Sequence, residues 1–126
     1  MVAIFCLKLL SNEKPVINGD GKQTRDYVFV GDVIRANLKA LSYSGSNIFN
    51  IGTGKETTVN QIFAYINSTA GVNFEEIHGP AKDGEQIRSV IDYRKAQKFL
   101  GWQPQTELAD GIKRTVEFFK SKLNKS

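Results

Sequence analysis

Apolar residues recur at helical spacing in three separate stretches of this chain, and this periodicity constrains the fold more than any other feature. The positions are Ile34, Leu38 and Leu41; Val59, Ile62, Phe63 and Ile66; and Leu108, Ile112, Val116 and Phe119. Apolar residues three and four apart share one face of a helix, so each stretch is typical of an amphipathic helix. We therefore expect helices over residues 33–42, from residue 59 to Gly71, and from residue 108 onward.

Two further helices are predicted at the start of the chain and before Gly101. Residues 1 to about 12 carry an apolar face and end in a polar stretch before Pro15. The later helix stops at Gly101, because glycine suits the position after the last turn and Pro104 forbids continuation. The residues that this helix turns inward are Tyr93, Ala96 and Leu100.

Short polar side chains mark where three of these helices begin. Asp32 and Asp92 are expected N-caps, because a short carboxylate accepts hydrogen bonds from the free amides of a first helical turn. Thr58 and Gln61 are three residues apart and predict a capping box, in which each side chain pairs with the other residue's amide.

Short β-prone runs lie between the helices. We expect strands at Pro15–Ile17, Tyr27–Val30, Ile48–Ile51 and Phe74–Ile77, with Ile87–Ile91 as a strand or an extended stretch. The alternation predicts an α/β fold, or an α+β fold, with a small mixed sheet and about five helices. It does not predict a complete doubly wound domain.

The composition is that of one globular domain, residues 1–126. The chain is 40% hydrophobic and 24% charged, which suffices for a single core. It has no apolar run of about 18 residues and no signal-peptide pattern, so we expect a cytoplasmic protein without a membrane segment. With Cys6 and His78 as its only cysteine and histidine, neither a disulfide nor a structural metal site is expected.

A formal net charge of +4 permits nucleic-acid binding but does not indicate it. Much of the excess lies in and after the last helix, where cations suit the negative end of the helix dipole and favour solubility. No aromatic platform is interleaved with these residues, so we expect no nucleic-acid partner. The basic positions are Lys113, Arg114, Lys120, Lys122 and Lys125.

The turn Gly52–Lys55 invites comparison with a phosphate-binding loop, because it follows a strand-like run and precedes a helix. A P-loop would need glycine at position 49 and a hydroxyl residue at 56, where the chain has Phe49 and Glu56. Glu75 and Glu76 lie about 20 residues downstream, where a ribose-binding acid is found in dinucleotide folds, so this alternative stays open beside an ordinary tight turn.

No pattern predicts nucleophilic catalysis, and both Cys6 and His78 are interpreted as structural. Two predicted loops are more informative, one containing Arg25 and the other Lys82 and Glu85. A guanidinium can bind phosphate oxygens in pairs, an ammonium adds a second positive charge, and a carboxylate accepts hydrogen bonds from sugar hydroxyls. These residues could hold a nucleotide, or they could form ordinary surface ion pairs.

Four blocks together resemble the C-terminal half of nucleotide-sugar epimerases and dehydratases, the extended short-chain dehydrogenase/reductase family. The first block is Gly19–Val30, which reads GDGKQTRDYVFV and is followed by Asp32-Val33 and Arg35-Ala36-Asn37. The others are Phe49–Gly54 (FNIGTG); Ser89 with Asp92 and Lys95-Ala96; and Leu100–Pro104 (LGWQP) followed by Gly111-Ile112 and Thr115–Glu117. The resemblance covers practically the whole chain and is strongest to members similar to UDP-glucose 4-epimerase. It implies the C-terminal portion of the family's fold, without the complete Rossmann domain.

The resemblance also implies roles for five residues. Arg25 would contact the substrate diphosphate, Ile17 and Asn18 would line the nucleotide base, and Glu85 would lie next to the ribose. Lys82 stands where the family usually has arginine, which keeps the charge but loses the paired contact. Asn18 replaces a frequent aromatic residue and so removes a stacking surface. The implied ligand is a nucleotide sugar, with a UDP-hexose favoured.

The family's redox motifs do not occur in this chain. The family has a Tyr-x-x-x-Lys pair and a Gly-x-x-Gly-x-x-Gly turn for NAD. No tyrosine of this chain is followed four residues later by lysine, and its glycines do not form that turn; the tyrosines are Tyr27, Tyr43, Tyr65 and Tyr93. We therefore expect no catalytic residue, no cofactor bound by this chain alone, and an absent N-terminal NAD-binding half. The complete family enzyme uses NAD, and hydride transfer requires that cofactor to be oriented against the sugar.

Two functions follow as alternatives. In the first, the chain is the nucleotide-sugar-binding half of an epimerase and is not catalytically competent alone. In the second, it is a non-enzymatic interaction module or family relic. By resemblance, Ile48–Ile51 and the helix from residue 33 pack against the nucleotide-binding half, so an apolar patch and a strand edge would be exposed. We expect self-association or pairing with an NAD-binding chain.

Overall fold

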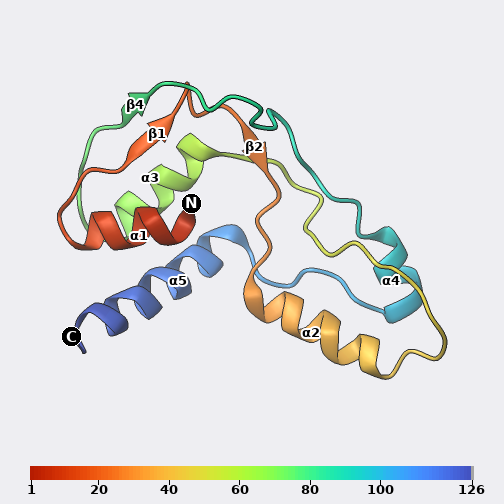
Figure 1. Cartoon of the computed structure of the whole chain (residues 1–126). Helices are drawn as coiled ribbons and strands as arrows, with labels where there is room; N and C mark the ends of the chain where they lie inside the picture. Colours follow the sequence, from red (N-terminus) through yellow and green to blue (C-terminus); the bar gives the residue numbers. More distant parts are fainter. Residues whose placement is uncertain (126) are drawn as a thin grey trace.

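The computed structural model describes residues 1–125 of the chain, and within them it has five helices and two short sheets (Figure 1). This is the α/β class with about five helices and mixed strand pairing that the sequence predicts. The elements are α1 (Val2–Leu10), β1 (Val16–Asn18), β2 (Thr24–Arg25), α2 (Val30–Leu41), β3 (Thr57–Thr58), α3 (Val59–Thr69), β4 (Ile77–Gly79), α4 (Arg94–Leu100) and α5 (Leu108–Leu123).

The strands form two separate pairs. β1 lies parallel to β4, with Ile17 opposite His78, whereas β2 lies antiparallel to β3, with Arg25 opposite Thr57. The parallel pair covers the end of the molecule where α1, α3 and α5 pack together, and α2 and α4 lie at the other end (Figure 1). Long segments without regular structure run between the two ends.

Apolar side chains gather in two clusters where composition led us to expect a single core. The main cluster joins α1, β1, α3 and α5 through residues that include Leu9, Ile17, Ile62 and Val116. The smaller cluster is built on Ala36, Ala96 and Trp102, and it links α2 to α4. Because the long segments separate the helices, neither cluster reaches all five.

The predicted helices are confirmed, and so is the capping box. The Thr58 hydroxyl accepts from the Gln61 amide at 3.1 Å, and the Gln61 side chain accepts from the Thr58 amide at 2.8 Å. Gly71 follows the end of α3 with φ of +74°, and Gly101 ends α4 with φ of +62°, a conformation that glycine adopts without strain. Local sequence signals therefore locate the start of α3 and the C-terminal ends of α3 and α4.

Both predicted aspartate N-caps are wrong. The N-cap of α2 is Phe29, and Asp32 lies inside the first turn, where it is buried. Its carboxylate is taken by residues more than 70 positions later in the chain. The N-cap of α4 is Tyr93, although Asp92 still accepts a hydrogen bond from the Arg94 amide at 3.0 Å.

Strand positions are predicted less well than helices. The runs Tyr27–Val30 and Ile48–Ile51 form no ladder in the described chain, and Val30 already belongs to α2. The strand expected at Phe74–Ile77 lies instead at Ile77–Gly79, and residues 87–91 belong to no strand or helix. β-prone side chains favour an extended backbone, but a strand also requires a neighbour for its amides and carbonyls.

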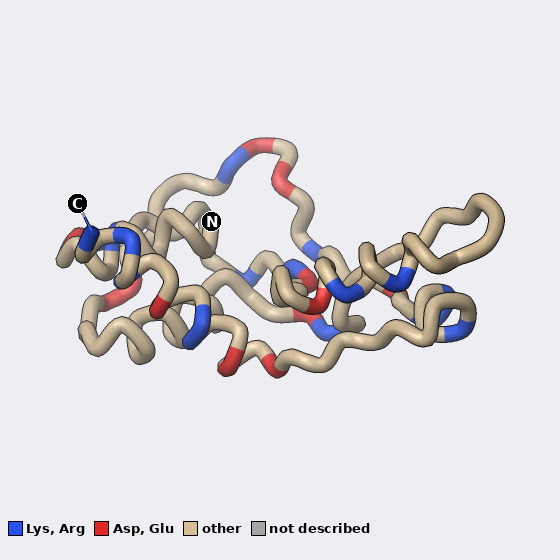
Figure 2. The backbone as a smooth tube through the Cα atoms, turned by 90° about the horizontal axis from the view of Figure 1, so that it is seen from below, with Lys and Arg blue, Asp and Glu red and all other residues tan. Residues whose placement is uncertain are grey.

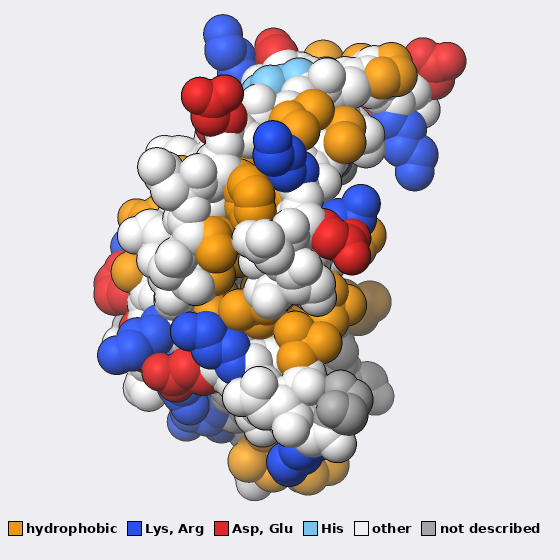
Figure 3. Space-filling view, turned by 90° about the vertical axis from the view of Figure 1, so that its left-hand side faces the viewer, with side chains coloured by type: hydrophobic (Ala, Val, Ile, Leu, Met, Phe, Trp, Pro, Cys, Tyr) orange, Lys and Arg blue, Asp and Glu red, His pale blue; other side chains and the backbone are white. Residues whose placement is uncertain are grey.

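Charged residues of both signs are scattered along the backbone between long uncharged stretches, and basic residues gather near the C-terminal end, where the sequence has Lys120, Lys122 and Lys125 (Figure 2). On the face that shows the α1 end of the molecule, exposed hydrophobic side chains lie among charged ones (Figure 3). Among the described helices, none has the length and apolar character that a bilayer crossing requires.

Candidate functional site

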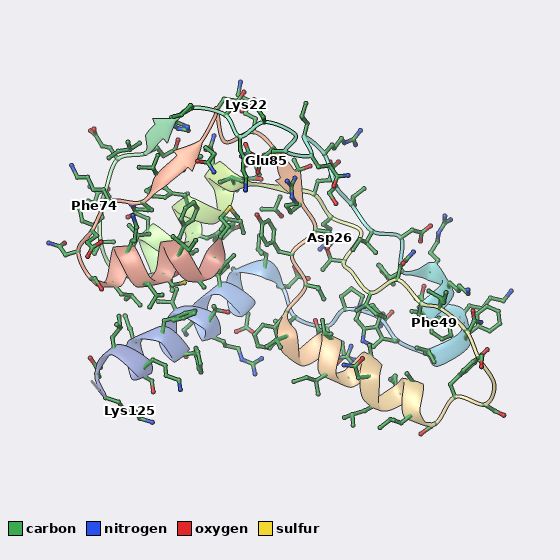
Figure 4. All side chains as sticks on the ribbon, viewed as in Figure 1. Lys22, Asp26, Phe49, Phe74, Glu85 and Lys125 are labelled. Carbon is green, nitrogen blue, oxygen red and sulfur yellow. The ribbon has the colours of Figure 1, made fainter. Side chains whose placement is uncertain are left out.

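Arg25 and Glu85 meet although they are 60 residues apart in the sequence. β2 carries Arg25, and its Nη2 lies 3.5 Å from Glu85 Oε1; the two side chains are 32% and 29% exposed. Arg25 Nη1 also donates to the carbonyls of Thr24 and Gln86, both at 2.6 Å. The guanidinium thus ties the loop of Glu85, labelled in Figure 4, to β2 and keeps part of its surface open to solvent.

The loop is held to β2 by backbone contacts as well. The Thr24 amide donates to the Ile87 carbonyl at 2.9 Å, and the Ser89 amide donates to Thr24 Oγ1 at 3.4 Å. These contacts place the loop beside β2 without making it a strand. Glu85 therefore has a defined position in a segment that lacks regular structure.

Lys82 and Asn18 are each linked to this pair by hydrogen bonds. The Glu85 amide donates to the Lys82 carbonyl at 3.2 Å, so a tight turn joins the two residues, and Lys82 is exposed. Asn18 ends β1, and its carbonyl accepts from Gln23 Nε2 at 3.1 Å. Gln23 Nε2 in turn lies 3.4 Å from Glu85 Oε2, which connects the end of β1 to the Arg25–Glu85 pair.

Ile17 is placed differently from the other predicted site residues. It is 1% exposed, and its side chain belongs to the main apolar cluster. Its side chain is therefore unavailable to a ligand. The structure brings Arg25 and Glu85 into contact and buries Ile17. It links Lys82 to Glu85 through a turn, and it links Asn18 to Glu85 through Gln23.

A second ion pair supports β2 from the opposite side. Glu56 receives two hydrogen bonds of 2.7 Å from Arg88 and one of 2.7 Å from the Thr24 hydroxyl. The Arg88 and Thr24 hydrogen bonds stabilise the carboxylate and lower the pKa of Glu56 to about 2. Glu56 thus stays ionised across the physiological range and anchors the loop after Ile87.

The turn at Gly52–Lys55 is filled by a side chain of the protein itself. The Asp26 carboxylate accepts from the amides of Thr53 and Gly54, both at 2.9 Å, and from the Ile91 amide at 3.2 Å (Figure 4). Helix α3 begins only at Val59, so the turn is not its N-terminus. The phosphate-loop interpretation of this turn is therefore wrong, because an internal carboxylate occupies the amides that a phosphate would need.

Cys6 and His78 lie away from the Arg25–Glu85 pair. Burial raises the pKa of the Cys6 thiol to about 11, so it remains a protonated, unreactive core side chain. His78 Nε2 lies 3.0 Å from Glu76 Oε2, and Nδ1 lies 2.7 Å from the Gly19 carbonyl. The hydrogen bond to Glu76 chiefly raises the pKa of His78. Among residues 1–125, no group of three or more potential metal ligands is found.

Sequence reasoning named Arg25 and Glu85 but missed the residues that position them. Gln23 and Asp26 flank Arg25 within the same motif, and Glu56 precedes β3. The only available signal was that several polar residues stand beside a short β-prone run. Apart from the contact of Gln23 with Asn18, the partners that hold the site are 27 to 65 positions away, a separation that local patterns do not reveal.

Residues 2–115 match the family described as GDP-mannose 4,6 dehydratase. UDP-glucose 4-epimerase of Mycolicibacterium smegmatis is 44% identical over 123 residues, which are 97% of this chain and 39% of that protein. The UDP-glucose 4-epimerase of Thermotoga maritima, solved with UDP-glucose, superposes with a TM-score of 0.93 at 45% identity and covers 97% of this chain and 40% of that one.

A third comparison is the Thermus thermophilus UDP-glucose 4-epimerase solved as a complex with NAD. Its TM-score is 0.84 at 32% identity, and the match covers 94% of this chain and 39% of that one. The chain thus spans about two fifths of the length of the relatives it matches.

Proposed function

The chain belongs to the GDP-mannose 4,6 dehydratase family, and from this membership we propose that it is the nucleotide-sugar-binding portion of an NAD-dependent epimerase acting on a UDP-hexose. The resemblance inferred from four sequence blocks and the family match agree on the same C-terminal portion. The Thermotoga maritima relative is described with UDP-glucose, which favours uridine as the nucleoside.

The observation that carries this proposal is the meeting of Arg25 and Glu85 at 3.5 Å on an accessible surface. A diphosphate needs cationic donors, and a ribose diol needs an acceptor, and the pair offers both within one ligand's reach. Lys82, one turn from Glu85, adds a second positive charge. In this arrangement Arg25 and Lys82 hold the diphosphate, and Glu85 accepts hydrogen bonds from the ribose hydroxyls.

The candidate cofactor cradle of this chain does not fit the phosphates of a dinucleotide. The Gly52–Gly54 turn is the candidate cradle for the cofactor's phosphates, and the Asp26 carboxylate occupies its amides. We therefore derive no redox step here and assign NAD to a portion of the enzyme that this chain does not span. In the complete enzyme, Arg25, Lys82 and Glu85 would keep the nucleotide fixed. The chain alone would bind without catalysing.

An exposed apolar stripe on α2 favours a protein partner and supports the alternative of an interaction module. Ile34, Leu38 and Leu41 repeat along α2 and are 52%, 60% and 83% exposed. Exposed apolar faces of this kind are typical of docking surfaces. We propose that α2 associates with an NAD-binding chain or with a second copy of this chain.

Light scattering tests the association. An average molar mass that rises with protein concentration, or when an NAD-binding relative is added, supports the association. Leu38→Lys should weaken either effect. A lysine on this exposed surface leaves the core unchanged, so folding is retained. A wild-type monomer at every concentration and with every such partner would overturn it.

Calorimetry with UDP, UDP-glucose and NAD tests the binding function. We expect heat from both uridine ligands, none from NAD, and at least tenfold weaker uridine binding in Arg25→Ala, since a charge-assisted contact contributes about 1.5–3 kcal/mol. Arg94→Ala is the matched control. Arg94 begins α4, its side chain is 85% exposed, and it pairs with Asp92 just before the helix. A folded wild-type chain that binds no uridine nucleotide would contradict the nucleotide-sugar-binding function. The interaction module would then be the remaining alternative.

A further inference from the structure

The Gln23 side chain contacts two residues of the candidate nucleotide site, Asn18 and Glu85. Its Nε2 donates to the Asn18 carbonyl at 3.1 Å and to Glu85 Oε2 at 3.4 Å. A side-chain amide nitrogen has two hydrogens, so both donors are used within the protein. Gln23 is thus positioned to hold these residues rather than to bind a ligand through the same nitrogen.

The backbone of Gln23 is fixed by α3. Its carbonyl accepts from the Val59 amide at 3.2 Å, and the preceding turn is held by Asn60, whose amide and side chain donate to Gly21 and Asp20. The residue is therefore held by backbone hydrogen bonds to the capped start of α3. Glu85, by contrast, lies in a loop without regular structure.

The two contacts to Glu85 restrain it from both sides. Oε1 lies 3.5 Å from Arg25 Nη2, and Oε2 lies 3.4 Å from Gln23 Nε2. Both distances are at the long end for hydrogen bonds, so the carboxylate is oriented but retains capacity to accept from a ligand. Without Gln23, the carboxylate would close onto Arg25 as a tighter ion pair, and the guanidinium would be less available to phosphate.

We propose that Gln23 is a positioning residue that holds Glu85 apart from Arg25 and thereby sets the preference of the site for a ribose diol beside a diphosphate. This inference rests on the proposed nucleotide-sugar function. It assigns specificity to a residue that contacts neither phosphate nor sugar.

The first test uses the ligand. In Gln23→Leu, which keeps most of the side-chain volume and removes its amide, calorimetry should show UDP affinity reduced about tenfold, as expected for one to two lost hydrogen bonds. The ratio of UDP affinity to 2′-deoxy-UDP affinity should fall as well, which a purely structural defect would not produce. Gln97→Leu makes the same change at an exposed position on α4, at the other end of the molecule, and should alter neither value.

The second test needs no ligand. Hydrogen exchange of the amides at residues 85–87 should be several-fold faster in Gln23→Glu, where two carboxylates face each other, and should recover in Gln23→Glu combined with Glu85→Gln. Both variants lose the donor to Asn18, so the difference between them isolates the contact with residue 85.

The outcomes separate the two proposals. If wild type binds UDP and Arg25→Ala does not, but Gln23→Leu keeps the wild-type affinity and ratio, the role of Gln23 is overturned and the binding function stands. Unchanged exchange in Gln23→Glu also overturns it. A folded wild type without affinity for UDP overturns both.

Discussion

The indole Nε1 of Trp102 donates a hydrogen bond of 2.8 Å to the backbone carbonyl of Asp32, 70 residues earlier in the chain. The Asp32 carboxylate then accepts from the amides of Gln105 and Thr106 at 3.1 and 3.0 Å and from Arg35 at 2.8 Å. One buried residue therefore joins α2 to the segment between α4 and α5. The smaller apolar cluster, which contains Trp102, depends on this connection.

Asp32→Ala should lower the free energy of unfolding by about 3 kcal/mol, because it leaves two part-buried hydrogen bonds from backbone amides and a guanidinium without their acceptor. Asp32→Asn keeps one acceptor oxygen and should cost less. Urea unfolding measures both changes, with Asp110→Ala on the exposed side of α5 as control. A loss below about 0.5 kcal/mol in Asp32→Ala would show that the connection is not stabilising.

Asp32 should also make the free energy of unfolding depend on pH in the acid range. Burial raises the pKa of Asp32, but hydrogen bonds from Thr106, Arg35 and Gln105 outweigh it, so the pKa lies below its ordinary value. The stabilisation is therefore present above the unfolded pKa of about 3.9 and is lost as the pH falls through the lower folded pKa. Asp32→Asn should flatten the unfolding profile in this range, and an unchanged profile would contradict the assignment.

Glu56 should titrate near pH 2, as carbon NMR of its carboxyl group can measure. In Arg88→Ala the midpoint should rise toward the ordinary value of 4.5, because the carboxylate loses its two charged hydrogen bonds. Arg94→Ala removes an arginine that pairs elsewhere and should leave the midpoint unchanged. Identical midpoints in wild type and Arg88→Ala would refute the pairing seen in the structure.

His78 gives a single, well-resolved probe, since the chain has one histidine. Hydrogen bonds to Glu76 and to the Gly19 carbonyl raise the pKa of His78 above 6.5, with Asp20 adding an attraction. Its contribution to stability is therefore complete below the unfolded pKa of about 6.5 and is lost as pH rises through the folded value. Proton NMR of the ring should show a midpoint that falls in Glu76→Gln, and a midpoint at or below 6.5 in wild type would be inconsistent with both contacts.

Lys55→Ala should leave nucleotide affinity unchanged. The turn before Lys55 already binds the Asp26 carboxylate, and the Lys55 ammonium lies 3.5 Å from Glu107 on an exposed surface. Calorimetry with UDP measures the effect. A several-fold loss of affinity in this variant would restore the turn as a candidate phosphate site.

Helices were predictable here because their signals are local. The stripe from Val59 to Ile66 and the Thr58–Gln61 box lie within one element and set its face and its start. The runs Tyr27–Val30 and Ile48–Ile51 have β-prone side chains, yet they form no ladder within residues 1–125, because pairing depends on distant neighbours. Five helices and a family resemblance were therefore within reach of the sequence, and strand positions were not.

The candidate site was predictable only in part, for the same reason. Resemblance named Arg25 and Glu85, but their contact and the loop that joins them follow from the folded chain. Gln23 and Asp26 gave no local signal, since each acts through partners far along the sequence. Ile17 was expected at the base, but its side chain is buried in the main cluster, because alternate residues of β1 face opposite sides.

The central claim is tested most directly by mapping backbone amide shifts in proton–nitrogen NMR spectra while UDP-glucose is added. The account predicts the largest shifts in two segments, Asn18–Arg25 and Lys82–Ile87, with little change at Thr53–Lys55. Saturating ligand that leaves both segments unshifted, or that shifts the Thr53–Lys55 turn instead, would contradict a nucleotide-sugar site at Arg25 and Glu85.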